Sequence, residues 1–91
     1  MKNQIQVGDV VRSLKGRDKG KLFLVVNVKD SKAETVDGRV RRVIEPKLKN
    51  QKHLETVYPM VLKELAEEIS KGNPVGNDRV WKAISIVKEK I

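Results

Sequence analysis

A run of seven residues, Leu22–Val28, is apolar except at Asn27 and is rich in β-branched side chains. Two segments that favour turns flank it: Gly16–Gly20, with a glycine at each end, and Asp30–Lys32. So short a stretch of this composition is typical of a strand buried on at least one face. The run therefore predicts a buried strand in which Phe23 is a core residue.

Further strand signals lie close to this run. In chain order they are a strand around Val10, Val11 and Leu14, a tight hairpin turn at Asp37-Gly38, a strand at Val40–Ile44 that Pro46 ends, and an extended piece near His53-Leu54. Several short strands at close spacing favour a small barrel.

The expected strand at Val40–Ile44 does not alternate cleanly. Arg41 and Arg42 are adjacent, so one of them faces the core side unless a bulge re-aims it. The sequence leaves open which of the two faces inward.

The last part of the chain has the periodicity of helices. Pro59 suits the first position of a helix, Gly72 the residue just past its end, and Asn77 the N-cap of a second helix. Apolar side chains lie on one stripe of each helix, which predicts that both pack across another surface. The stripes are Val61, Leu62, Leu65, Ala66 and Ile69 in the first helix, and Val80, Ala83, Ile84, Val87 and Ile91 in the second, with Trp81 at its edge.

These patterns predict a mainly β fold with added α-helices. We expect residues 1–56 to form a small SH3-like β-barrel, and residues 57–91 to form a two-helix extension that packs on it within the same compact unit. A chain of 91 residues is long enough for one domain with a modest core.

The charge of the chain is distributed unevenly. The 20 Lys and Arg residues exceed the 12 Asp and Glu residues by a net charge of +8. Residues 1–53 carry 14 basic and 6 acidic side chains, whereas residues 54–91 carry 6 of each. The whole excess therefore belongs to the strand-rich part, which favours a polyanionic partner, foremost a nucleic acid.

Composition argues against several other classes of protein. The chain has no cysteine, which excludes disulfides and thiolate zinc sites. We expect a cytoplasmic protein with no membrane partner, because the first residues lack the apolar core of a signal peptide and no apolar run is long enough to span a bilayer. His53 has no evident catalytic partner, and Glu64, Glu67 and Glu68 occupy the polar side of a helix. No enzymatic activity, metal or cofactor is expected.

The stretch from Val11 to Val26 resembles a KOW motif, with a Val-Arg-Ser strand, a Gly-Arg-Asp-Lys-Gly loop and a following apolar strand. This element is shared by several ribosomal proteins and transcription elongation factors. The resemblance continues through Asp37–Val43 and Pro46-Lys47 to His53-Leu54, roughly residues 6–56 in all. In this longer form the chain is similar to bacterial KOW-domain RNA-binding proteins, which are related to a group of archaeal and eukaryotic large-subunit ribosomal proteins. The resemblance implies a structured, ribosomal RNA as partner.

Basic residues of this segment fall into three candidate RNA-binding sets. Glycines at both ends of the loop would let its backbone approach a phosphate closely. Basic residues at every second position would share one side if the hairpin is extended, and we expect Asp18 among them to have a structural role. The first set is Arg12, Ser13, Lys15, Gly16, Arg17, Lys19, Gly20 and Lys21, the second is Arg39, Arg41 and Arg42, and the third is Lys47, Lys49 and Lys52.

Aromatic residues are scarce, which affects the kind of RNA that we expect. Tyr58 and Trp81 lie outside the basic part, and single-strand binders stack bases on several aromatic side chains. We therefore expect recognition of folded RNA through its backbone and shape, with low sequence specificity. The acidic side of the first helix would repel RNA and is expected to point away from it.

Two alternatives stay open at this level. A protein-interaction module would use the SH3-like barrel and the helical tail, and it predicts a contiguous apolar patch around Trp81 and Ile86. A transcription-elongation accessory would keep the barrel but bind RNA polymerase, since the KOW element occurs in that setting as well as on the ribosome.

Overall fold

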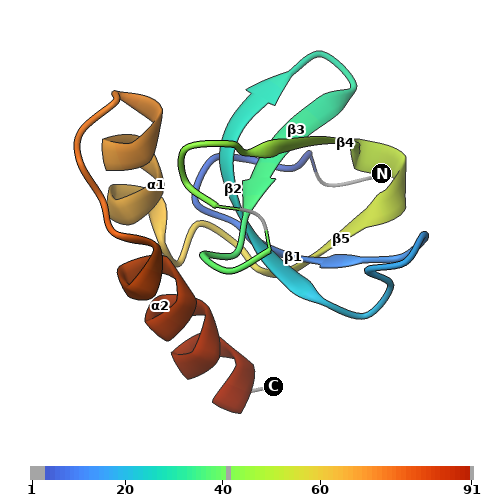
Figure 1. Cartoon of the computed structure of the whole chain (residues 1–91). Coiled ribbons are helices and arrows are strands. Elements are labelled where there is room, and N and C mark those ends of the chain that lie inside the picture. Colours follow the sequence, from blue (N-terminus) through green and yellow to red (C-terminus); the bar gives the residue numbers. More distant parts are fainter. Residues whose placement is uncertain (1–3, 41, 91) are drawn as a thin grey trace.

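The computed structural model describes residues 4–40 and 42–90 of the chain, and it shows a small compact α/β domain (Figure 1). Five strands and a short 3₁₀ turn precede two helices. The elements are β1 (Val10–Ser13), β2 (Leu22–Lys29), β3 (Lys32–Val36), β4 (Lys47–Asn50), the 3₁₀ turn η1 (Gln51–His53), β5 (Leu54–Tyr58), α1 (Lys63–Ser70) and α2 (Asn77–Glu89). Neither helix is long and apolar enough to cross a membrane.

All neighbouring strands pair antiparallel, in the order β4-β3-β2-β1-β5. β4 and β5 are the outer strands of this ladder, so the observed fold is a five-stranded sheet with two helices rather than a closed barrel. η1 joins the two outer strands, and its ends bond to other turns: Gln51 N–H donates to the Ser31 carbonyl and Leu14 N–H to the His53 carbonyl.

Strand β2 is buried on both faces of the sheet, which explains why it is an almost continuous apolar run. Successive side chains of a strand point to opposite faces. Phe23 and Val25 therefore pack on one face with Ile5 and Leu54, within a cluster that joins strands across the sheet. Leu24 and Val26 pack on the other face against both helices, in a cluster that includes Leu65, Ala66, Val80 and Ile84. The expected core position of Phe23, which is 1% exposed, is confirmed.

Helix α1 begins at Lys63, four residues later than Pro59 had predicted. The intervening turn is fixed to the sheet, because the buried Asp9 carboxylate accepts the Met60 N–H at 2.7 Å and the Gly8 carbonyl accepts the Leu62 N–H. Met60 has a φ of 49°, which is incompatible with a helix. The expected helix end is confirmed, since α1 stops at Ser70 and Gly72 follows with a φ of 82°.

The prediction that Asn77 is an N-cap is wrong. Gly76 precedes the first turn of α2, and Asn77 is already helical. Its side-chain carbonyl instead accepts the N–H of Val43 at 2.8 Å and so links the helix to the connection between β3 and β4. A side-chain oxygen near the start of a helix can accept a hydrogen bond from a local or a distant N–H group, and in this protein the donor is the distant Val43 N–H.

The described residues of Val40–Ile44 are not in a strand, contrary to the sequence pattern. In the connection between β3 and β4, residues 37–40 and 42–46 have no strand or helix, and Val40 is 71% and Ile44 is 84% exposed. The partner of β3 is β4 instead, with Thr35 opposite Lys47. Arg42 is exposed in this connection, so it need not face a core, and Arg41 lies outside the described residues.

Candidate nucleic-acid interface

A tight turn, residues 14–21, joins β1 to β2 and is called the β1–β2 loop below. Gly16 and Gly20 have φ values of 88° and 89°, a left-handed conformation that glycine adopts without strain. Gly20 N–H donates to the Ser13 carbonyl at 2.8 Å, and Lys21 N–H donates to the Asp18 carbonyl at 2.9 Å. The glycine at each end of the motif therefore has a direct backbone role.

A buried polar cluster fills the inside of this turn. Ser13 Oγ lies 2.7 Å from Asp18 Oδ1, and Lys49 Nζ from β4 lies 2.6 Å from the same oxygen. The side chains of Lys49 and Asp18 are only 13% and 11% exposed. Asp18 therefore has a structural role through the Ser13 hydroxyl and the Lys49 ammonium. Ser13 and Lys49, both candidate RNA contacts, are placed where they hold the loop rather than where they present a group to solvent.

The basic residues of the loop do not share one side as the alternation had suggested. That inference needs an extended chain, whereas residues 17–20 form a turn. All four basic residues are exposed, but only Arg17 and Lys21 line a common hollow, and Lys15 and Lys19 do not.

This hollow, called the loop hollow below, measures about 400 Å³ and joins two of the candidate sets. The exposed Lys47 of β4 lines it together with Arg17 and Lys21, although Lys47 follows them by some thirty residues. Such a hollow combines side-chain cations with glycine backbone at one end, which is the chemistry that binds phosphate. Its complete lining is Gly16, Arg17, Asp18, Lys21, Val40, Lys47 and Lys49.

A second hollow of about 400 Å³, called the helix groove, adjoins the first, since Lys21 and Val40 line both. Arg39, from the second candidate set, places its guanidinium 4.2 Å from the ring centre of Trp81 on α2. The groove is lined by Gly20, Lys21, Leu22, Asp37, Arg39, Val40, Trp81, Ile84, Ser85 and Lys88.

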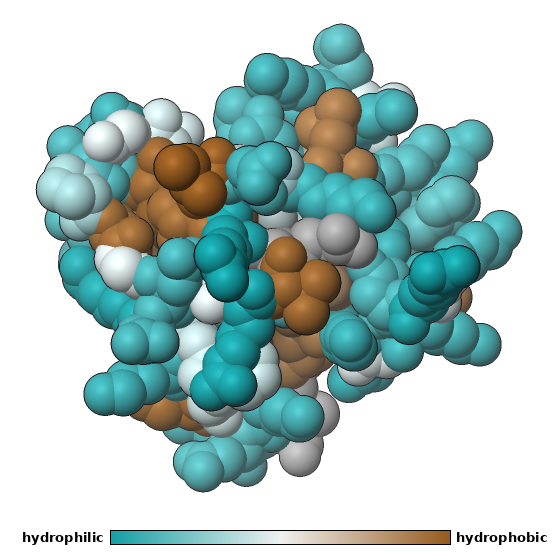
Figure 2. Space-filling view, viewed as in Figure 1, coloured by the Kyte–Doolittle hydropathy of each residue, from teal (hydrophilic) through white to brown (hydrophobic). Residues whose placement is uncertain are grey.

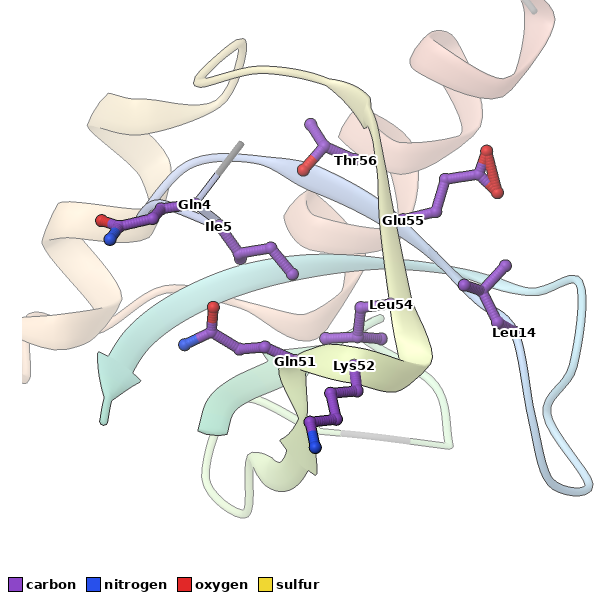
Figure 3. Close-up of a pocket in the computed structure, with 8 residues that line it drawn as sticks. All are labelled: Gln4, Ile5, Leu14, Gln51, Lys52, Leu54, Glu55 and Thr56. Carbon is purple, nitrogen blue, oxygen red and sulfur yellow. The ribbon is translucent and has the colours of Figure 1, made fainter. Parts of the chain in front are cut away.

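The remaining candidates lie elsewhere. Arg12 is half-exposed and lies 3.9 Å from Glu55 on the neighbouring strand. Lys52, on η1, lines a different hollow, in which Gln51 and Leu54 are its neighbours and Glu55 adds a negative charge (Figure 3). Neither residue lines the loop hollow or the helix groove.

On the face shown in Figure 2, hydrophilic side chains divide the exposed apolar surface into separate areas. Trp81 and Ile86 are 37% and 56% exposed. Five positions on a helix correspond to about 140° of rotation, so these two lie on opposite flanks of the buried stripe of α2. The contiguous patch required by the protein-interaction alternative is therefore not formed by this pair.

Acidic residues of α1 are on a separate element from the loop hollow. Glu64 is exposed, and Glu68 pairs with Arg79 of α2 at 3.4 Å. Within residues 4–40 and 42–90, no three acidic or histidine side chains come together as a metal site would require.

Sequence reasoning missed two contributors to this surface. The helical periodicity places Trp81 only at the edge of a core stripe, yet Trp81 contacts Arg39 across the two parts of the chain. The second contributor is strand β4, whose signal is the strand-like alternation of Lys47, Leu48 and Lys49. No family model and no curated protein sequence matches this chain.

Proposed function

We propose that this protein binds structured RNA, ribosomal RNA foremost, by gripping the phosphate backbone with the loop hollow and the basic residues around it. The observation that carries the proposal is the meeting of Arg17, Lys21 and Lys47 at one hollow beside the Gly16 backbone. An arginine can fork onto a phosphate with two hydrogen bonds, and lysines add point charges. The proposed activity is binding without catalysis, and it needs no cofactor.

The connection of the β1–β2 loop to the sheet supports this proposal. The Lys49–Asp18 ion pair joins the loop to β4, so the segments that carry Arg17 and Lys47 are connected before any ligand arrives. A preorganised set of cations loses less conformational entropy on binding than a flexible one. Phosphate contacts of this kind carry no base information, which favours a ligand recognised by shape.

The same proposal includes the family and the finer fold. We place the chain with the KOW-domain RNA-binding proteins and regard its sheet as an SH3-like barrel that is incompletely hydrogen-bonded. In support, β1, the β1–β2 loop and β2 follow the strand–loop–strand order of the motif, with glycines at both ends of the turn. The apolar cluster around Phe23 also draws side chains from β1, β2, β3 and β5 onto one inner face.

A salt titration with matched variants tests the function. The probe is a fluorescently labelled, fully paired RNA duplex of 16 base pairs, and the readout is anisotropy. If four to six phosphates are contacted, log affinity should fall with log salt at a slope of about −4 to −5. Arg17→Ala and Lys47→Ala should each weaken binding several-fold and reduce the slope by about 1.

Lys71→Ala is the control, because Lys71 is exposed at the end of α1 and its loss changes the net charge by the same amount. Equal affinity of Arg17→Ala, Lys47→Ala and Lys71→Ala would overturn the assignment to the loop hollow. Crosslinking of the protein to RNA in cells, followed by sequencing, then tests the target class. Enrichment of ribosomal RNA that Arg17→Ala/Lys47→Ala abolishes is the expected result, and enrichment of unrelated transcripts alone would contradict the ribosomal target.

A further inference from the structure

The helix groove differs in chemistry from the loop hollow beside it. Its floor contains the apolar Leu22 and Ile84, and its wall contains the indole of Trp81, which is 37% exposed. The guanidinium of Arg39 lies over that indole, so these two flat groups form a stack in the lining of the groove. A groove that is apolar and planar in part suits a flat, weakly polar ligand rather than a phosphate alone.

Charge around the groove indicates the rest of the ligand. Lys21, Arg39 and Lys88 contribute three cations to its lining. Its one acidic residue, Asp37, is 6% exposed and accepts the backbone N–H of Arg39 at 2.8 Å. A nucleotide combines a flat ring with adjacent negative charge, and a volume of about 400 Å³ accommodates one base.

Continuity with the loop hollow decides between a free nucleotide and a nucleotide within RNA. Lys21 and Val40 line both spaces, so a strand whose phosphates lie in the loop hollow passes the mouth of the helix groove. In a continuous duplex every base is stacked inside the helix and cannot enter. An unpaired base at a bulge can be splayed out and stacked on aromatic or guanidinium planes.

We infer that the helix groove binds a single unpaired RNA base, which stacks on the Trp81–Arg39 pair while the flanking phosphates contact Lys21 and Lys88. The inference rests on the proposed RNA-binding function and makes it more specific: the preferred ligand is a duplex interrupted by a bulged nucleotide. Helix α2 would then contact the RNA directly, in addition to packing on the sheet.

Three duplexes of 16 base pairs test this site. The first is fully paired, the second carries one bulged adenosine at its centre, and the third carries an abasic nucleotide at the same place. The abasic bulge keeps the extra phosphate and the bend but removes the base. We expect the adenosine bulge to bind about tenfold more tightly than the abasic bulge, in line with the usual contribution of base–aromatic stacking.

Trp81 is the only tryptophan of the chain, so intrinsic fluorescence reports directly on the groove. The adenosine bulge should quench this emission, whereas the abasic and fully paired duplexes should leave it nearly unchanged at saturation. Arg39→Lys, which keeps the charge but removes the plane, should reduce the tenfold preference to about twofold, and Trp81→Leu should abolish it. Trp81→Phe should restore part of it, and Ile86→Ala on the opposite flank should leave it unchanged.

The outcomes separate the two proposals. Salt-dependent binding that requires Arg17 and Lys47 but shows equal affinity for adenosine and abasic bulges would overturn this inference and leave the proposed function standing. A preference that survives both Trp81→Leu and Arg39→Lys would place the base elsewhere and also overturn it. Failure of all three duplexes to bind at low salt would overturn the proposed function and the inference together.

Discussion

The two basic loops of this protein are held in different ways. The β1–β2 loop is stabilised internally by its left-handed glycines and by the buried hydrogen bond between Ser13 and Asp18. The ion pair between Asp18 and Lys49 joins the loop to strand β4. The described residues of the connection between β3 and β4, 37–40 and 42–46, are called the β3–β4 loop. This loop contacts α2 through the Val43–Asn77 hydrogen bond and the Arg39–Trp81 stack, and Val43 also packs against the apolar cluster between the sheet and the helices.

The closest of these contacts is at Gly38. A Cβ added there would overlap the backbone carbonyl of Asn77 and lie 2.9 Å from the amide nitrogen of Trp81. The helix therefore packs against bare backbone of the loop. The contrast teaches that two basic loops of one molecule can differ in structural support: the first is joined to strand β4, and the second is joined to helix α2.

The largest expected effect separates two lysines of β4. Lys49→Met should lower the free energy of unfolding by about 3 kcal/mol, because it leaves the nearly buried Asp18 carboxylate without its ammonium partner. Lys47→Met should change it by less than about 0.5 kcal/mol, since Lys47 is exposed. Urea denaturation followed by circular dichroism measures both.

RNA affinity, measured on the folded variants, should show the reverse order, with Lys47→Met the weaker binder. Adding Asp18→Asn to Lys49→Met should recover part of the lost stability, as expected when both members of a buried pair become uncharged. Equal stability of the two single lysine variants would contradict a structural role for Lys49.

A smaller difference, about 2 kcal/mol between two glycine variants, tests how the β3–β4 loop is held. Gly38→Ala should cost about 3 kcal/mol, since alanine meets both an unfavourable φ of 84° and the backbone of α2. Gly72→Ala has a similar φ of 82° but no neighbour within 4 Å, so it should cost only about 1 kcal/mol. Thermal or urea unfolding measures the loss of unfolding free energy in each variant, and the difference between the two losses reports the close contact of Gly38 with α2. Equal losses in the two variants would show that this contact does not contribute to stability.

The smallest effect concerns a single hydrogen bond. Asn77→Ala should lower stability by about 1 kcal/mol, because the Val43 N–H then loses its partner. Hydrogen exchange should show faster exchange at the Val43 amide, with unchanged protection of the Gly20 amide in the other loop. Asn73→Ala, at an exposed position in the turn between the helices, is the matched control and should alter neither amide.

Much of the fold followed from local patterns. The strand at Leu22–Lys29, the turn with glycines at its ends, and the stripes that bury Leu65, Val80 and Ile84 all express periodicity or conformational preference within a few residues. The same locality misled at Val40–Ile44, where β-branched residues suggested a strand. Their backbone instead meets α2, some thirty-five residues further along the chain.

The candidate site divides in the same way. Arg17 and Lys21 could be chosen from sequence because the motif that presents them is contiguous. Their meeting with Lys47 depends on the pairing of β3 with β4, and the burial of Lys49 depends on where Asp18 lies across the sheet. The sequence predicts neither the position of Lys47 nor the burial of Lys49. A lysine has the same secondary-structure preference whether its ammonium group contacts a carboxylate or water.

The sequence by itself determined which segments could be strands, turns and helices, and that the excess positive charge belongs to the first part of the chain, because these properties are local or additive. Only the tertiary structure decided which cations face one another, which lysine is buried, and that Trp81 meets Arg39. Those relations arise when apolar faces pack and bring distant segments within a few ångströms, and hydrophobic burial, which drives this packing, is non-directional.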